Sequence, residues 1–462
     1  MGTKASNCTF IIHPDGNDLN GGAFDHDYGG TDASQDDDPI VVIDGSTITC
    51  EIIDNYTLKL VGYDVQASDV GNCLFGQAAD GTTVDGDYQW HQTGPVSSVD
   101  TTNNYWVFSA QQTWGGTFAT ELQSGRLGGA LATLGGLNDP TYPYGRVGEA
   151  SVVYMKAATY TLSSSDFESG GKWQNYYTAT HLCAYKTTPG DHYDNTEDRV
   201  IIDTGSTASG GTVITYTSSR IEFVTGIEVR GNDTWTSAIG GMISCANCVA
   251  KEFTGTGFSL GQDHGTCFSC RAEGCGTSGS NAGFSGAHCI ECIAIDCFNG
   301  FYNASATRCV AHGGSYSFSL SSYNMAHACV ADGASQYGYI GNAYSLSENC
   351  VAMNCTYGME TRGGFGPGSA FYNNTNNVNS STNDGRYRNP LQLTAAPFTD
   401  SANYDYTVND DSGGGAELAT RSPKFGAGVS ESGPQQQQSG QLKSTGGGST
   451  TVVTPGPVQI GM

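Results

Sequence analysis

Paired cysteines are the first residues of this chain whose type and spacing could do chemistry. Two such pairs with 18 residues between them fall within the spacing of a four-cysteine zinc site. A third pair follows at the same 22-residue step, however, and a zinc site needs four ligands that converge on one point. We therefore expect a ladder of reduced thiols and no structural metal, with zinc and inter-coil disulfides as the alternatives. The pairs are Cys245 with Cys248, Cys267 with Cys270, and Cys289 with Cys292.

Clusters of carboxylates near the amino terminus are the second candidate site. Asp15 to Asn20 and Asp36 to Asp38 offer the hard oxygen ligands that calcium prefers. The first segment lacks the loop length and the distal glutamate of a calcium-binding loop. Asx-type turns are the favoured interpretation of both segments, and we expect no cofactor.

A catalytic pair of carboxylates would have to lie among the residues expected to point outward. Glu273 and Asp332 lie three repeats apart, about 14 Å at the spacing of paired strands, which exceeds the roughly 5–9.5 Å of a glycosidase pair. Lys251 and Glu273 are neighbours, but any protein surface supplies one such pair. The sequence therefore predicts no catalytic centre and a protein that is not an enzyme, with a polysaccharide lyase or glycoside hydrolase as the alternative.

A repeat explains the cysteines. Six Cys-x-Ala segments follow one another at intervals of 22, 22, 17, 20 and 21 residues, and each precedes a second short strand signal such as Gly257-Phe258. Units of about 20 residues with two strand signals each are typical of stacked β-solenoids. The sequence thus predicts an all-β protein built on a right-handed parallel β-helix, with the repeated cysteines stacked inward on one sheet. They are Cys248, Cys270, Cys292, Cys309, Cys329 and Cys350.

The residue between each Cys and Ala should point outward, because strand side chains alternate between faces. Five of these six outward residues are apolar and β-branched, so this stripe should be covered. One candidate cover is a loop or the C-terminal tail of the same chain. The other, which the sequence favours, is a subunit interface in a homotrimer or another symmetric oligomer. The expected interface residues are Val249, Ile293, Val310, Val330 and Val351.

Three regions follow from this pattern. An N-terminal β-rich region covers 1–144, and the β-helix covers 145–410. Within the β-helix, Gly226-Ile227 is assigned to the second strand signal of its coil, the position that Gly257-Phe258 occupies in a later coil. The segment 411–462 closes the chain with a flexible arm rich in Gly and Gln, expected from Gly426 onward to reach a neighbouring subunit.

Charge limits the range of partners. The 462-residue chain carries 45 acidic and 19 basic side chains, a net charge of −26. Such a surface repels phosphate backbones and anionic membranes. Nucleic acid and membranes are therefore excluded as expected partners, while glycans and protein surfaces remain.

Five short segments, in order along most of the chain, resemble right-handed parallel β-helix proteins of environmental bacteriophages and some bacteria. That resemblance implies the β-helix and a role as a virion component. The Gln/Gly-rich extension to Met462 departs from the family pattern. The matching segments are 14–24, 127–133, 153–161, 185–191 and 397–408 with the glycines that follow.

The expected function is accordingly that of a non-catalytic structural protein of a phage virion, either a capsid decoration protein or a fibre or spike, assembled in the host cytoplasm. Its expected partners are copies of itself and other virion proteins such as the major capsid protein, with a host surface glycan as a further candidate. Two alternatives stay open: a tailspike that binds or degrades polysaccharide, and a bacterial surface adhesin.

Overall fold

The structure is a computed structural model. It describes residues 8–78, 89–110, 121–132, 151–161, 173–174, 179–189, 191, 199–205, 211–215, 223–233, 235–241, 243–261, 265–321, 323–341, 344–360, 364–365, 368–379, 390–409 and 414–421. The C-terminal arm expected from Gly426 onward lies outside these residues. Among those described, no helix is long and apolar enough to cross a membrane.

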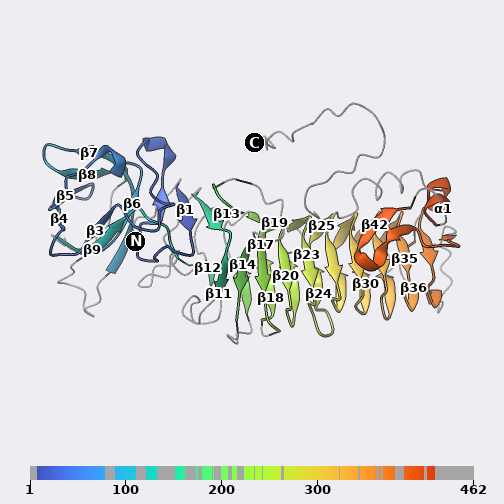
Figure 1. Cartoon of the computed structure of the whole chain (residues 1–462). Coiled ribbons are helices and arrows are strands. Elements are labelled where there is room, and N and C mark those ends of the chain that lie inside the picture. Colours follow the sequence, from blue (N-terminus) through green and yellow to red (C-terminus); the bar gives the residue numbers. More distant parts are fainter. Residues whose placement is uncertain are drawn as a thin grey trace, which may run out of the picture.

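The described chain is dominated by a parallel β-helix, as predicted (Figure 1). Each coil contributes one short strand to each of three sheets, and each strand pairs in parallel with its counterpart in the next coil. We number the sheets 1, 2 and 3 in the order in which a coil visits them.

The strands of each sheet follow one another along the solenoid axis. In spatial order, sheet 1 contains β2 (Ala23–Phe24), β1 (Thr9–Ile12), β10 (Ser151–Lys156), β13 (Ala179–Tyr185), β16 (Phe223–Thr225), β19 (Ser244–Ala246), β22 (Thr266–Phe268), β25 (His288–Ile290), β28 (Ser305–Thr307), β31 (Met325–His327), β34 (Leu346–Glu348) and β37 (Gly364–Phe365). Sheet 2 contains β11 (Thr159–Thr161), β14 (Val200–Asp203), β17 (Ile227–Arg230), β20 (Val249–Lys251), β23 (Arg271–Glu273), β26 (Ile293–Ile295), β29 (Val310–His312), β32 (Val330–Asp332), β35 (Val351–Met353), β38 (Ala370–Tyr372) and β40 (Leu391–Gln392). Sheet 3 contains β12 (Trp173–Gln174), β15 (Thr212–Thr215), β18 (Ser237–Gly241), β21 (Thr256–Leu260), β24 (Ala282–Ser285), β27 (Asn299–Tyr302), β30 (Tyr316–Leu320), β33 (Tyr337–Gly341), β36 (Tyr357–Glu360) and β39 (Asn376–Asn379).

The six repeated cysteines are buried and stack from coil to coil, but they occupy the bend between sheets 1 and 2 and not a strand. The residue before each one adopts a positive φ, for example 54° at Asn247 and 50° at Ser269, which turns the chain sharply. The thiols carry no disulfides. Each thiol donates to a main-chain carbonyl oxygen, as Cys248 Sγ does to Val224 O at 3.4 Å, and so has a hydrogen-bond partner although it is buried.

Aromatic rings fill the part of the interior that faces sheet 3. Phe258, Phe284, Phe301 and Phe318 stack on successive coils with ring centroids 4.8–5.0 Å apart and near-parallel planes. They are fully buried. This spacing equals the separation of paired strands, so the stacking helps to fix the register of the coils.

The N-terminal region forms a separate seven-stranded antiparallel sheet at one end of the solenoid (Figure 1). Its strands are β3 (Val41–Ile43), β9 (Glu121–Leu127), β4 (Thr49–Ile52), β5 (Thr57–Val61), β8 (Tyr105–Phe108), β7 (Gln89–Asp100) and β6 (Cys73–Ala78). The solenoid begins before the expected residue 145, because β1 pairs in parallel with β10 and so forms its first rung.

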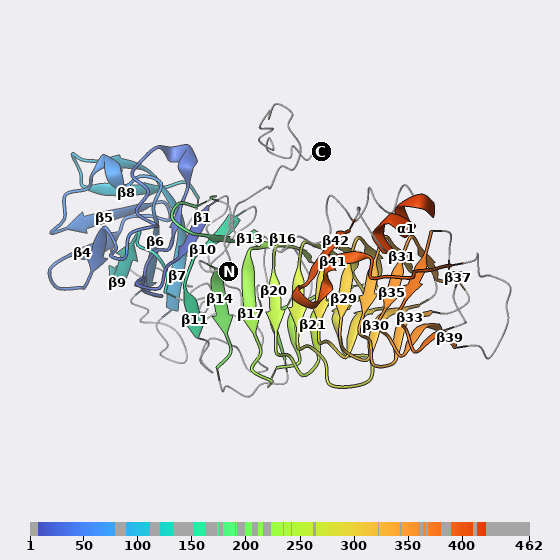
Figure 2. The same cartoon turned by 45° about the vertical axis from the view of Figure 1, so that its right-hand side comes forward.

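The C-terminal segment folds back over the outer face of sheet 2 (Figure 2). It consists of a hairpin of β41 (Phe398–Asp400) and β42 (Asp405–Val408), followed by helix α1 (Gly414–Arg421). Phe398, Tyr406, Val408 and Leu418 pack against the apolar stripe in one buried cluster. We call this segment, the described residues 398–409 and 414–421, the cover.

The cover corrects the expected subunit interface. Val310, Val330 and Val351 are at most 1% exposed and belong to the cluster beneath the cover. Val249 and Ile293 are 5% and 6% exposed, so none of the five residues lies on the surface of the single chain. At the three valines, the stripe is covered by the same chain and not by a second subunit.

Candidate functional site

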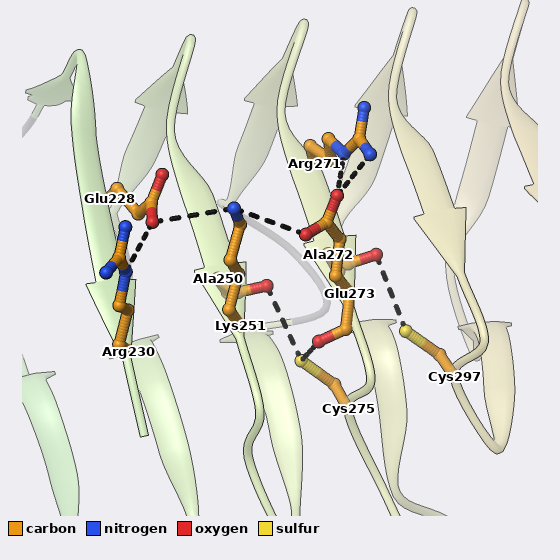
Figure 3. Close-up of polar contacts among 9 residues, drawn as sticks. All are labelled: Glu228, Arg230, Ala250, Lys251, Arg271, Ala272, Glu273, Cys275 and Cys297. Carbon is orange, nitrogen blue, oxygen red and sulfur yellow. Dashed lines mark hydrogen bonds and ion pairs between the residues drawn. The ribbon is translucent and has the colours of Figure 1, made fainter. Parts of the chain in front are cut away.

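A cluster of charged side chains lies on the outer face of sheet 2, on three successive strands (Figure 3). We call it the charged cluster. The register of the parallel strands aligns Arg230 with Lys251 and Lys251 with Glu273. Because residues two apart on a strand share a face, Glu228 and Arg230 of β17 point outward together with the first and third residues of β20 and β23. Its members are Glu228, Arg230, Lys251, Arg271 and Glu273.

Lys251 is the centre of the cluster. Its Nζ lies 3.5 Å from Glu228 Oε1 and 3.4 Å from Glu273 Oε2. Arg230 Nε donates to Glu228 Oε1 at 2.6 Å, and Arg271 donates to Glu273. Each carboxylate is thereby shared between two cations.

The two carboxylates are closer than any pair that sequence analysis found. Since both lie within 3.5 Å of one nitrogen, the two oxygens are at most about 7 Å apart, below the upper limit of the roughly 5–9.5 Å range of paired carboxyl groups in glycosidases. Glu228 is nearly buried, with 7% of its side chain exposed, whereas the other four side chains are 24–37% exposed. The cluster is therefore accessible from solvent mainly through its basic members and Glu273.

Sequence analysis found Lys251 and Glu273 but missed Glu228. The reason is the assignment of Gly226-Ile227 to the position of Gly257-Phe258, which belongs to sheet 3. In the structure Val229 pairs with Ala250, so β17 is a strand of sheet 2 and Gly226, at φ 74°, is its preceding bend. Reading Ile227-Glu228-Val229 as a variant of Cys-x-Ala would have placed Glu228 outward, one rung from Lys251.

A second polar cluster joins the cover to the solenoid. Tyr406 donates its hydroxyl to Asp332 Oδ2 at 3.0 Å and accepts from His312 Nδ1 at 2.8 Å. Asp332 is 3% exposed and lies 3.4 Å from His312 Nδ1. The hydrogen bond to this carboxylate raises the pKa of His312, against the opposing effect of burial. We call these three residues the latch.

The two acidic segments near the amino terminus do meet at one point. His13, Asp15 and Asp37 place their nitrogen and oxygen ligand atoms within 4.8 Å of one another, and no other such group occurs among the residues that the structure describes. His13 Nδ1 lies 3.0 Å from Asp37 Oδ1. Its Nε2 contacts the Lys156 ammonium, and burial and that charge lower the pKa of His13. The Lys156 ammonium would repel a cation bound at this point, so the structure gives no reason to assign a metal to these three residues.

Comparisons with known proteins support the fold alone. No known protein family and no curated protein sequence matches the chain. A pectate lyase structure is 13% identical with a TM-score of 0.32, and the match covers 53% of this chain and 72% of that one. A rhamnogalacturonan lyase is 14% identical with a TM-score of 0.29, covering 53% and 68%. The catalytic domain of a GH87 α-1,3-glucanase with bound tetrasaccharides is 11% identical with a TM-score of 0.28, covering 79% and 95%.

The expectation that the chain is not an enzyme is withdrawn: the β-helix structures similar to it include two lyases, a mannuronan C-5 epimerase and a glucanase. At such low identities and TM-scores no catalytic residue is transferred from them. None of these structures is described as a virion protein. The virion location, the capsid partner and the homo-oligomer therefore stay predictions from the sequence.

Proposed function

We propose that this chain acts on an acidic polysaccharide, which binds along the outer face of sheet 2 at the charged cluster. The observation that supports the proposal is the net positive charge of the cluster. It holds three basic and two acidic side chains, whereas the chain as a whole carries −26. A locally basic site attracts anionic groups that the rest of the acidic surface repels.

The layout of the cluster favours a polymer. Its members come from β17, β20 and β23, which follow one another along the solenoid at the spacing of paired strands, about 4.8 Å per rung. Arg230 and Lys251 are aligned on adjacent rungs, and Arg271, which aligns with Val249, lies one rung further and to one side. The three thus form a stepped basic row about 10 Å long. A chain that carries a carboxylate on successive units can contact this row at more than one point.

Among cleavage chemistries, elimination fits the cluster better than hydrolysis. Hydrolysis requires one carboxyl group to give a proton to the leaving oxygen. Glu228 and Glu273 each already lie against two cations, which leaves neither placed as a proton donor. Elimination instead requires a base that takes the proton beside the substrate carboxylate, cations that neutralise that carboxylate, and a proton for the leaving oxygen. Glu273 is the candidate base and can pass the proton it takes to the leaving oxygen, while Lys251 and Arg271 beside it are the candidate cations.

Affinity electrophoresis and product analysis test this proposal. We expect the protein to bind polygalacturonate more tightly than dextran, with an affinity that falls as salt is added. Lys251→Ala and Arg271→Ala should each weaken binding about tenfold, the loss of one charge-assisted contact. Products are assayed both for unsaturated ends, which report elimination, and for new reducing ends.

Lys59→Ala is the matched control. Lys59 also forms an ion pair, 3.6 Å from Glu51, but it lies on the N-terminal sheet away from the cluster. The proposal fails if the wild-type protein retains no acidic polysaccharide, or if Lys59→Ala weakens binding as much as Lys251→Ala.

A further inference from the structure

Tyr404 is a strained residue at the edge of the charged cluster. It follows the short helical turn Ser401–Asn403 and precedes β42, and its φ is 62°. A bulky side chain in the left-handed region is uncommon, and such residues persist only where the surrounding structure holds them. Glycine or asparagine would fit this backbone with less strain.

The strained backbone places the Tyr404 ring beside a residue of the cluster. The guanidinium carbon of Arg271 lies 5.7 Å from the ring centroid, which is a cation–π distance. On another side the ring meets His312 edge to face, with centroids 5.0 Å apart and planes at 84°. Tyr404 is half-buried, so part of the residue remains open to solvent.

The latch fixes the position of this ring. Tyr406 lies two residues after Tyr404, in β42. Its hydroxyl is hydrogen-bonded to Asp332 and His312, and the residue is 4% exposed. Its ring also packs edge to face on Phe398 of β41, with centroids 5.4 Å apart. The hairpin is thus held on the solenoid at the point from which Tyr404 reaches the charged cluster.

We infer that Tyr404 forms an aromatic subsite of the polysaccharide site, on which one sugar ring stacks while the carboxylate of that sugar pairs with Arg271. This inference rests on the proposed function and adds to it the contribution of the cover. A sugar ring presents an apolar face of C–H bonds, which an aromatic ring accepts, and its carboxylate is matched by the guanidinium beside that ring. The strain at Tyr404 is then the cost of placing an aromatic ring at the end of the basic row.

The test uses two substitutions in the full chain. Tyr404→Gly removes the ring and suits the backbone, while Tyr404→Phe keeps the ring. We expect Tyr404→Gly to weaken binding of polygalacturonate fivefold or more. Its melting temperature should stay close to that of the wild type, because relief of the left-handed strain offsets the lost ring packing and the greater chain entropy of glycine. Tyr404→Phe should bind within about twofold of the wild type.

The outcomes separate this inference from the proposed function. If the wild type binds polygalacturonate and Arg271→Ala weakens it, but Tyr404→Gly does not, the aromatic subsite is wrong and the proposed function stands. Equal losses in Tyr404→Gly and Tyr404→Phe would also overturn the subsite, since the ring would not be what matters. A wild type that binds no polygalacturonate overturns both, and does so before any variant is made.

Discussion

The outer face of sheet 2 has two halves. Their strands pair in the same register, but their outward side chains and their exposure to solvent differ. In the first half β17, β20 and β23 carry the charged cluster, which is partly open to solvent. In the second half β29, β32 and β35 carry valines that the cover buries. Yet Arg271, Ile293, Val310 and Val330 are aligned residues on consecutive rungs.

The difference shows that a solenoid face has no fixed role. Behind sheet 2 the interior is narrow, so small residues recur there in the coils with the Cys-x-Ala repeat. On the outside, the side chain alone decides whether a rung becomes surface, site or core. Tyr404 reaches from the latch in the covered half to Arg271 in the open half, so the cover contributes both to stability and to the proposed site.

Removing the cover should have the largest effect. A chain that ends after Leu393 would expose Val310, Val330 and Val351, each of which gains about 1.5–3 kcal/mol from burial. We expect it to self-associate through the exposed stripe, as a large apolar patch does. A chain that ends after Arg421 keeps the cover and is the control. Light scattering compares their masses, and equal masses would mean that the cover does not shield the stripe.

A charge beneath the cover should have the next largest effect. Val330→Asp buries an unpaired carboxylate at a site that is 1% exposed and loses a buried apolar side chain. We expect a loss of about 3–5 kcal/mol in the free energy of unfolding, measured with urea. Glu273→Gln, in the open half, should change it by less than about 1 kcal/mol, because ion pairs that are partly open to solvent contribute little and the amide keeps the shape of the side chain. Similar losses in the two variants would contradict the division into halves.

The latch should make the covered half sensitive to pH. The pKa of His312 is raised above 6.5 in the folded chain by its hydrogen bond to Asp332, and the nearby Asp296 acts in the same direction. The stabilisation is therefore fully present below the unfolded pKa and is lost as pH rises through the folded pKa. Tyr404 and Tyr406 are the other titratable groups in contact with this imidazole.

The measurement compares His312→Gln with the wild type at about pH 5.5 and about pH 8.5, on either side of the ordinary histidine range. We expect the variant to lose more stability at the lower pH than at the higher one. The reverse order would show that His312 is neutral when the cover is docked. His288→Gln is the control, because His288 is exposed and lies on sheet 1.

The coils could be predicted from the sequence because the interior repeats. Cys-x-Ala recurs at nearly constant spacing, and a narrow stacked interior is what requires small residues at so regular an interval. Sequence analysis assigned the repeated cysteines to a strand, whereas they lie in a bend. The residues that make the bend, such as Asn247 and Arg308, have a positive φ but differ in type, so the sequence does not mark them. The apolar stripe predicted a cover of some kind, but a sequence cannot say which distant segment packs on it.

The candidate site was harder to predict than the fold. Lys251 and Glu273 follow the repeat, whereas Glu228 lies on a coil whose interior is Ile227 and Val229 in place of Cys and Ala. Tyr404 lies about 130 residues from Arg271 in the sequence and on the cover, outside the repeat altogether. Contacts of this kind depend on tertiary packing and have no local signal.

The smallest effect on the free energy of unfolding should come from changes to the interior cysteines, which lie in similar surroundings beneath both halves. Cys270 lies beneath the open half and Cys329 beneath the covered half, and both are at most 1% exposed. Their sulfurs lie 3.4 Å from Phe268 O and 3.3 Å from His327 O. Changing either cysteine to alanine removes one weak donor and one sulfur's volume, so each should cost about 1 kcal/mol in urea unfolding. We expect the two losses to agree within about 0.5 kcal/mol, as for independent sites of the same kind. A much larger loss at Cys329 would mean that the cover tightens the coils beneath it, and that inside and outside are not independent.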